Sequence, residues 1–264
     1  MMPAEFDITG KVVFITGAGR GIGKGIARVL AESGADVAIN ALTPTHVEPL
    51  AAEIASDSGR RAVPVVADVT SSEGARQAVT QVLDTFGRID VLVNALGDSI
   101  RTPLVTLPEN DATPTPIGDD DLRFILDINL TEALLCTRAV GPHMLARRSG
   151  KVINIASWTA RSGGREIVLY TTAKTALAGF TRAQALEWAA YGVQVNCIAP
   201  GLFPDIVTGG EEGVRRSTER ARATVPLGRP GALREVGLLA LYLASSASDY
   251  MTGQTLMLDG GLSL

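Results

Sequence analysis

Short apolar runs alternate with amphipathic stretches along most of this 264-residue chain. The apolar runs lie at 11–16, 36–40, 62–68, 89–94, 151–157, 193–200 and 254–258. Stretches with the apolar spacing of helices lie between them, at 22–33, 47–57, 72–86, 119–147 and 170–190. Strands that are apolar throughout are buried on both faces, which is typical of a parallel sheet between two layers of helices. The pattern predicts an α/β fold with a single doubly wound, parallel seven-stranded sheet, and residues 1–264 are expected to form one domain.

A glycine-rich turn, T-G-A-G-R-G-I-G at 16–23, follows the first apolar run and opens the first helical stretch. Gly17 permits a tight turn, while Gly21 and Gly23 allow close approach of the backbone to a ligand and of the helix to the strand. The start of the helix offers free N–H groups and the positive end of the helix dipole to a diphosphate. In this position, the turn predicts a Rossmann fold that binds a dinucleotide.

Tyr170 and Lys174 stand four residues apart in the stretch I-V-L-Y-T-T-A-K, which is otherwise apolar or small. On a helix, this spacing places both side chains on one face. A free phenol has a pKa of about 10, which is too high for a base at neutral pH. A neighbouring ammonium and the positive charge of an oxidised nicotinamide would lower that pKa. We therefore expect Tyr170 to exchange a proton with an alcohol or ketone while the cofactor carries the hydride.

Two further polar residues are candidates for the same site. Ser157 ends the run N-I-A-S and should point out of the carboxyl edge of the sheet, where ligands of open α/β sheets bind. Its hydroxyl can donate to a developing oxyanion. Asn129 lies in L-D-I-N-L, within a predicted helix, although an amide is a mediocre helix former. The alternative for each residue is a structural role as a cap or surface group.

The order and spacing of these motifs resemble the short-chain dehydrogenase/reductase family over almost the whole chain. The turn has the family spacing T-G-x-x-x-G-x-G, and Asp68-Val69, N-A-L-G (94–97) and Pro200-Gly201 follow in the family order. The resemblance implies an NAD(P)-dependent oxidoreductase that interconverts a secondary alcohol and a ketone. It also implies a catalytic set, which consists of Asn129, Ser157, Tyr170 and Lys174. In this family, the lysine also holds the nicotinamide ribose, and the asparagine kinks its helix and holds a water of a proton relay.

The resemblance also predicts where the cofactor binds. The expected contacts are Gly17, Gly19, Arg20, Gly21, Ile22, Gly23, Thr43, Asp68, Val69, Asn94, Ala95, Tyr170, Lys174, Pro200 and Gly201. Relatives that use NAD carry an acidic residue after the second strand, whereas this chain has A-L-T at 41–43. No carboxylate there would repel a 2′-phosphate, and Arg20 and Thr43 could contact it, so we predict NADP in preference to NAD. The arginine that strong NADP users often carry at 41 or 42 is missing.

Several positions depart from the family pattern. Ala95 and Leu96 stand in N-A-L-G, where relatives have N-N-A-G. Asp205 stands near the position of a threonine that bonds the cofactor carboxamide in many relatives, so another group, such as the backbone of Ile206, would have to replace it. The 106–118 segment contains three prolines and is predicted to be a long loop. Residues 202–231 are predicted to be a helix-loop, either a lid over the site or a passive surface insertion.

The sequence leaves the substrate open. The stretch R-S-G-G-R-E-I-V-L-Y resembles sugar-acid and polyol dehydrogenases a little more than fatty-acyl reductases. Arg161 or Arg165 could then hold a substrate carboxylate, and the alternative is that both are solvated loop arginines. Specificity is also expected from three side chains outside the catalytic set, Asp98, Ser99 and Trp158, and from 202–220. Because of Arg215 and Arg216, reduction of a 3-oxoacyl thioester on acyl carrier protein stays an alternative. A non-catalytic nucleotide sensor on the same fold is another.

Composition restricts the partners and the compartment. The net charge of −4 predicts no binding to nucleic acid or to an anionic membrane. Only two cysteines occur, Cys136 and Cys197, and the first ten residues lack the pattern of a signal peptide, which predicts a cytoplasmic protein. His46 and His143 are far apart in the sequence, and we expect no catalytic metal. The family resemblance implies a homotetramer that assembles through the two long helices.

Overall fold

The apolar runs form one parallel sheet with the strand order β3-β2-β1-β4-β5-β6-β7. The computed structural model describes residues 3–106 and 115–264. The strands are β1 (Val12–Ile15), β2 (Asp36–Ala41), β3 (Ala62–Val66), β4 (Val91–Asn94), β5 (Gly150–Ile155), β6 (Val193–Pro200) and β7 (Thr255–Leu258). The predicted Rossmann fold with seven parallel strands is confirmed. The direction of winding changes between β1 and β4, and open α/β sheets bind ligands at the carboxyl edge beside such a switch point.

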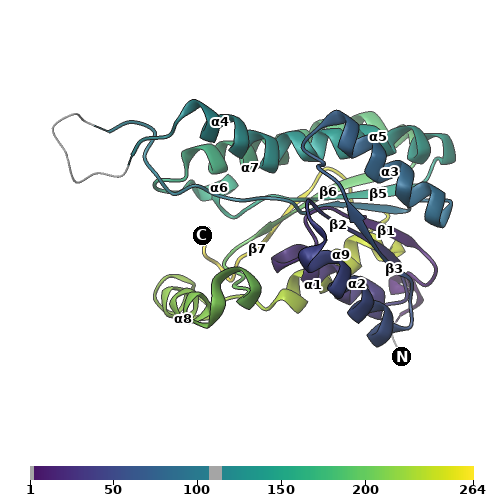
Figure 1. Cartoon of the computed structure of the whole chain (residues 1–264), viewed down its shortest axis with the longest axis horizontal. Coiled ribbons are helices and arrows are strands. Elements are labelled where there is room, and N and C mark those ends of the chain that lie inside the picture. Colours follow the sequence, from purple (N-terminus) through teal and green to yellow (C-terminus); the bar gives the residue numbers. More distant parts are fainter. Residues whose placement is uncertain (1–2, 107–114) are drawn as a thin grey trace.

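Helices cover both faces of the sheet (Figure 1). One layer contains α1 (Gly21–Glu32), α2 (Pro44–Ser58) and α9 (Leu233–Ala244). The other contains α3 (Ser72–Phe86), α4 (Asp119–Leu126), α5 (Glu132–Arg147) and α7 (Val168–Trp188). Alternate residues of β1 face the two layers, with Val13 in the core of the first and Phe14 in the core of the second. This burial on both sides explains why the strands are apolar throughout.

The sequence analysis did not identify α9. Its buried residues Val236, Ala240 and Leu241 lie on one face, so its pattern does not set it apart from the helices that were predicted. α9 packs tightly on α1, and two glycines permit this approach. A Cβ on Gly25 would lie 2.7 Å from the Leu233 carbonyl oxygen, and a Cβ on Gly237 would lie 2.5 Å from the Val29 side chain.

Short turns complete the chain. They are the 3₁₀ turns η1 (Ala4–Phe6), η3 (Ala189–Tyr191) and η4 (Ser246–Ser248), the short helix α6 (Thr159–Ser162), and the π-helical turn η2 (Asp127–Thr131). The π turn joins α4 to α5, so the predicted helix over 119–147 is interrupted once. Within the described ranges, no helix combines the length and the apolar character needed to cross a membrane.

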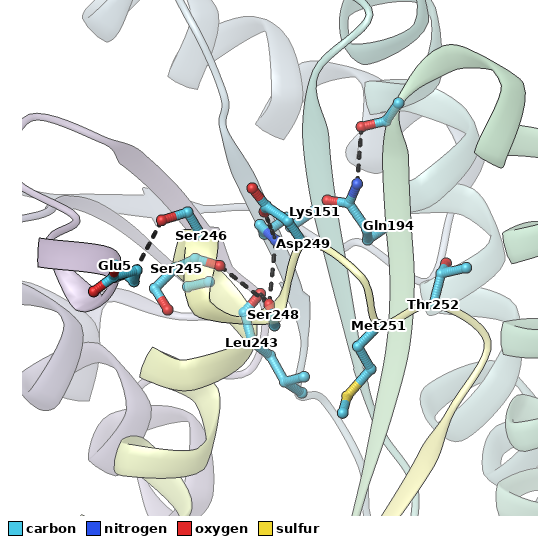
Figure 2. A network of polar contacts seen from close by, with 12 residues as sticks. Glu5, Lys151, Gln194, Leu243, Ser245, Ser246, Ser248, Asp249, Met251 and Thr252 are labelled. Carbon is cyan, nitrogen blue, oxygen red and sulfur yellow. Dashed lines mark hydrogen bonds and ion pairs between the residues drawn. The ribbon is translucent and has the colours of Figure 1, made fainter. Parts of the chain in front are cut away.

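A polar network fixes the amino edge of the sheet around Lys151, the second residue of β5 (Figure 2). The Lys151 Nζ donates to the Ser248 Oγ at 3.2 Å and pairs with the Asp249 Oδ1 at 2.8 Å. In the same network, the Ser246 hydroxyl donates to the Glu5 carbonyl oxygen at 3.0 Å. These bonds join the N-terminal turn, η4 and β5 at the edge opposite the carboxyl ends of the strands.

The segment 202–231 is largely the helix α8 (Ile206–Thr224), which lies beyond the carboxyl ends of the strands (Figure 1). Gly210 has φ 63° and ψ −178°, so α8 consists of two helical pieces that meet there. Ala221 is the one residue of α8 that is buried. Of the predicted 106–118 loop, residues 107–114 lie outside the described residues, and 115–118 lead into α4.

Candidate active site

A pocket of about 200 Å³ opens at the carboxyl edge of the sheet, beside the ends of β5 and β6. It is lined by Ile22, Ser99, Arg101, Ala156, Ser157, Trp158, Thr159, Ile167, Tyr170, Pro200, Gly201, Leu202 and Arg220. Two wider surface hollows, of about 560 Å³ on α3 and about 730 Å³ beside residues 249–254, contain none of the predicted site residues. The smaller pocket is therefore the candidate active site, because it gathers predicted residues from the glycine turn, β5, α7 and β6.

Ser157 lies just beyond the end of β5 and is 4% exposed. The Thr159 backbone N–H donates to its Oγ at 3.2 Å, and the Thr159 hydroxyl contacts the same oxygen at 3.1 Å. Both lone pairs of the Ser157 oxygen are thereby occupied, which leaves its own proton to be donated into the pocket. A donor fixed in this way suits the stabilisation of negative charge on a substrate oxygen.

Tyr170 and Lys174 lie on one face of α7, as their spacing predicts. Tyr170 lines the pocket, whereas Lys174 is 3% exposed and lies behind it. The Lys174 Nζ donates to the carbonyl oxygens of Ile155 at 2.9 Å and Leu96 at 3.4 Å. These bonds hold the ammonium between the ends of β4 and β5.

Asn129 is completely buried in the π turn between α4 and α5. π-helical turns often occur at functional sites, and this one is the interruption that the family resemblance implies. The Asn129 Nδ2 donates to the carbonyl oxygens of Asp98 at 2.7 Å and Ile125 at 2.9 Å, while its Oδ1 has no partner within the described chain. A Cβ on Gly97 would lie 2.8 Å from this Oδ1 and 3.1 Å from the Lys174 Nζ. The free oxygen and the ammonium therefore face the same small space.

The protein alone does not lower the pKa of Tyr170. Lys174 is expected to lower it together with the charge of an oxidised nicotinamide, whereas burial in the protein raises the pKa of the phenol above its ordinary value. Interaction with the Ser157 hydroxyl opposes this rise, and the charge of Asp98 adds to it. The ammonium is itself affected, because burial lowers the pKa of Lys174 to about 8. The phenol is thus held in its protonated form at neutral pH.

Glu132 is a buried acid that the sequence analysis did not identify. It follows the π turn, three residues after Asn129, and is 1% exposed. One of its carboxylate oxygens, Oε2, has no hydrogen-bond partner in the described chain. Burial raises the pKa of Glu132 to about 8, and the opposite charge of Lys174 works against this rise. The acid and the lysine therefore influence each other's pKa in the interior.

The glycine turn has the shape that a bound diphosphate requires. Gly21 has φ 59°, and a Cβ placed on it would meet no atom within 4 Å, so the space beside its Cα is open. A Cβ on Gly17 would lie 2.7 Å from the Leu96 Cα, and one on Gly23 would lie 2.6 Å from the Gly17 carbonyl oxygen. The turn is therefore tight against β4 and the helix is close to the strand, which fits a dinucleotide.

The other predicted cofactor residues are spread along the carboxyl edge. Arg20, Thr43 and Asp68 are exposed there, after β1, β2 and β3 respectively. The Val69 side chain is 2% exposed and belongs to the hydrophobic core, so only its backbone can contact a ligand. The Ala95 N–H donates to the Thr16 Oγ1 at 3.0 Å and is not free.

Asn94 is likewise committed within the protein. Its Nδ2 donates to the Asn154 Oδ1 at 2.8 Å and the Thr137 Oγ1 at 3.1 Å, so it joins β4 to β5 and α5. Its Oδ1 has no partner in the described residues. The side chain therefore fixes the strands beside the site, as a strand residue in N-A-L-G should.

Asp205, which precedes α8, lies against the glycine turn. Its side chain is 4% exposed, and its Oδ2 accepts a hydrogen bond from the Gly21 backbone N–H at 3.0 Å. Its Oδ1 pairs with the Lys24 Nζ at 3.3 Å. Burial by itself raises the pKa of Asp205. The Gly21 hydrogen bond and the Lys24 charge lower it by more, so the pKa lies below its ordinary value.

Arg161 and Arg165 are not among the residues that line the pocket, which favours the alternative that they are solvated. Both are exposed, Arg161 within α6 and Arg165 in the chain that follows it. The charged residues of the lining are Arg101 and Arg220, the latter from α8. Ser99 and Trp158 do line the pocket, as predicted.

Comparison with known proteins identifies relatives that match nearly the whole chain. A family model described as enoyl-(acyl carrier protein) reductase matches residues 17–263. The chain is 35% identical over 258 residues to 2-dehydro-3-deoxy-D-gluconate 5-dehydrogenase of Bacillus subtilis, covering 97% of this chain and 96% of that protein. It is 37% identical over 257 residues to 3-oxoacyl-[acyl-carrier-protein] reductase of Synechocystis, covering 97% and 98%.

Solved structures give the same result. A crystal structure provisionally assigned as an NAD(P)-dependent gluconate 5-dehydrogenase of Beutenbergia cavernae, with NADP bound at low occupancy, superposes with a TM-score of 0.85. Its sequence is 36% identical, and the match covers 98% of this chain and 99% of that one. A structure provisionally assigned as a short-chain alcohol dehydrogenase of Sinorhizobium meliloti superposes with a TM-score of 0.87 at 34% identity, covering 98% of each chain.

Proposed function

This chain belongs to the short-chain dehydrogenase/reductase family and is an NAD(P)-dependent oxidoreductase, and we propose that it interconverts a secondary alcohol and a ketone at Ser157 and Tyr170. The observation that carries the proposal is that one pocket presents a serine hydroxyl and a tyrosine phenol, with the buried Lys174 directly behind them. When the cofactor is bound, its nicotinamide ring supplies or accepts the hydride.

Tyr170 exchanges the proton in this proposal. The raised pKa keeps the phenol protonated, which suits donation to a ketone oxygen during reduction. Ser157 donates a second hydrogen bond to the same oxygen and stabilises its negative charge. For oxidation of an alcohol, the Lys174 ammonium must favour the phenolate. The unpaired Asn129 Oδ1 can accept a hydrogen bond from a water that passes protons to Lys174.

We also propose that the cofactor runs along the carboxyl edge from Asp68 to Pro200 and that NADP is preferred to NAD. The support for NADP comes from the residues that follow β1 and β2. The chain after β2 has no carboxylate at 41–43, and the exposed Arg20 and Thr43 lie at the same edge. The ratio of kcat/KM values for the two cofactors measures the preference, and a ratio that favours NAD would overturn it.

The substrate that fits best is an alcohol or ketone that carries a carboxylate, such as a sugar acid. Two arginines, Arg101 and Arg220, are the charged residues of the pocket lining, and guanidinium groups bind carboxylates well. Reduction of 3-oxoacyl thioesters is the second candidate. The exposed Arg215 and Arg216 pair with Glu219 and Glu212 on the same helix, at 3.2 and 3.3 Å, so little unbalanced positive charge is left there for an acyl carrier protein.

The test is turnover of a panel of sugar acids, polyols, 3-oxoacyl thioesters and cyclic ketones with both cofactors, together with the variant Tyr170→Phe. Turnover should fall at least about 10²-fold in the variant, while calorimetry shows unchanged cofactor binding. Tyr191→Phe, which changes an exposed tyrosine outside the pocket, is the matched control and should keep full activity. Full activity in Tyr170→Phe would overturn the mechanism, and cofactor binding without any turnover across the panel would favour the nucleotide sensor.

We further propose that residues 1–264 act as one domain, that the protein forms a homotetramer and that it works in the cytoplasm. Cys136 and Cys197 are both free and buried, which is compatible with a reducing compartment.

A further inference from the structure

The start of α1 already holds a carboxylate. α1 has Arg20 at its N-cap, and the Arg20 side chain makes no capping bond. Asp205, 184 residues away in sequence, accepts the hydrogen bond of the Gly21 N–H instead and pairs with Lys24 from the first turn of the helix. The Thr208 hydroxyl, from the first turn of α8, also donates a hydrogen bond to the Asp205 Oδ2 at 3.2 Å.

These are the groups that a dinucleotide needs. Free N–H groups at the start of α1 and its positive dipole bind a diphosphate, and a lysine in the first turn adds a positive charge. A diphosphate and the Asp205 carboxylate cannot share this place, because they would repel one another at a few ångströms in a site that is largely shielded from water. The glycines of the turn fit the cofactor, whereas Asp205 conflicts with it.

We propose that Asp205 competes with the cofactor's diphosphate for the start of α1, so that the cofactor binds only by displacing it from Gly21 and Lys24. While the cofactor is absent, Asp205 joins α8 to α1. When the cofactor binds, Lys24 pairs with the diphosphate in place of the Asp205 carboxylate. Asp205 thus lowers the affinity for the cofactor, although it makes no favourable contact with the cofactor.

Displacement of Asp205 must also affect α8, because Asp205 immediately precedes that helix. α8 has one buried residue, and the break at Gly210 provides a position where its first piece can turn without moving the second. The second piece carries Arg220 into the pocket. Cofactor binding should therefore change the mobility of 206–209 first, and the arrangement predicts that cofactor binds before substrate.

The test is the Kd of NADP and of NAD, measured by calorimetry without substrate, for the wild type, Asp205→Asn and Asp205→Thr. Removal of the competing charge should tighten binding about tenfold or more in both variants. Glu211→Gln, which removes an exposed carboxylate from the same helix, should leave the Kd unchanged. An unchanged or weaker affinity in both Asp205 variants, with melting temperatures near that of the wild type, would overturn the proposal. That result would mean that Asp205 only caps α1.

Hydrogen exchange of the amides of 206–209 supplies a second readout. Saturation with cofactor, or with inorganic pyrophosphate as a smaller probe, should speed exchange there in the wild type. In Asp205→Asn, these amides should exchange fast before any ligand is added. Slow exchange that no ligand changes would contradict displacement. Both measurements need only cofactor binding, so they stay informative even if the proposed reaction at Tyr170 proves wrong.

Discussion

The Nζ of Lys174 lies 5.9 Å from the centre of the Tyr170 ring and is bonded to two backbone carbonyl oxygens. The lysine is therefore fixed by the ends of β4 and β5, and in the proposed mechanism it would act on the phenol through its charge. Its influence depends on whether it is protonated. Because its pKa is about 8, that state changes within the range in which enzymes are assayed.

Ser157→Ala should lower kcat for ketone reduction by about 10²–10³, because the substrate oxygen loses a fixed donor. Steady-state kinetics measure the loss. Ser162→Ala is the matched control, since Ser162 is an exposed serine of neighbouring α6. Equal activity in the two variants would remove Ser157 from the mechanism.

Gly97→Ala should also reduce activity strongly, by about 10-fold or more. Its methyl group would lie 2.8 Å from the Asn129 Oδ1 and 3.1 Å from the Lys174 Nζ, closer than unstrained contacts allow. The control is Gly213→Ala on α8, where an added Cβ meets no atom within 4 Å. Activity assays at matched cofactor saturation decide the outcome, and a fully active Gly97→Ala would contradict the placement of Lys174 beside Asn129.

Arg220→Gln should raise KM for a sugar acid about 10- to 100-fold while leaving KM for an uncharged polyol nearly unchanged, because only the acid loses a charged partner. Arg222→Gln removes an exposed arginine from the same helix, outside the pocket lining, and serves as the control. A KM that rises equally for both substrates would show that Arg220 shapes the pocket and does not select anions.

Stability should depend on pH through Glu132. Its pKa is about 8 in the folded protein, against an ordinary value of 4.5, so the folded state keeps a proton that the unfolded state has lost between these values. This contribution to the free energy of unfolding is complete below about pH 4.5 and falls away as pH rises through 8. Glu132→Gln cannot lose that proton, so its melting temperature relative to the wild type should rise steadily from pH 5 to pH 8.

Glu187→Gln is the control for this pH series, because it alters an exposed carboxylate of α7. Lys174 contributes with the opposite dependence. Between pH 8 and about 10.5 the folded state has lost the Lys174 proton, whereas the unfolded state still binds it. The cost of burying the charged ammonium therefore disappears over this range, and the free energy of unfolding rises with pH. A melting temperature difference between Glu132→Gln and the wild type that is constant with pH would show that Glu132 is not held neutral.

Sedimentation should show a homotetramer. Large apolar side chains remain exposed on the helices expected to assemble, with Phe124 47% exposed on α4 and Leu186 83% exposed on α7. Phe124→Glu and Leu186→Glu should each shift the protein towards smaller species, because a charge would be buried in the interface. Leu227→Glu, at an exposed position outside these helices, should not. A monomeric wild type would reject the assembly.

Local patterns were sufficient for the strands, the glycine turn and the pairing of Tyr170 with Lys174, because each depends on residues that are neighbours in sequence. They could not reveal that Asp205 reaches Gly21, since that contact joins positions 184 apart. Glu132 shows a second limit. A carboxylate in a helix normally faces water, and only the folded structure shows that this one does not, because Glu132 is 1% exposed.

The same limit explains why the sequence left the substrate arginines open. Arg161 and Arg165 are close to Tyr170 in sequence, but both are exposed, Arg161 within α6 and Arg165 after it. Arg220 is far away in sequence and enters the pocket only because α8 folds back over the carboxyl edge.

The amino edge of the sheet, where the network around Lys151 lies, and α8 are expected to differ in their resistance to heat. The amino edge of the sheet is held by ionic and hydroxyl contacts of the buried Lys151, whereas α8 has one buried residue, an alanine, and the Asp205 contact before it. Regions with few buried contacts open at lower free energy than the core. On heating, the enzyme should therefore stop working while its sheet is still intact, and cooling from that point should restore it.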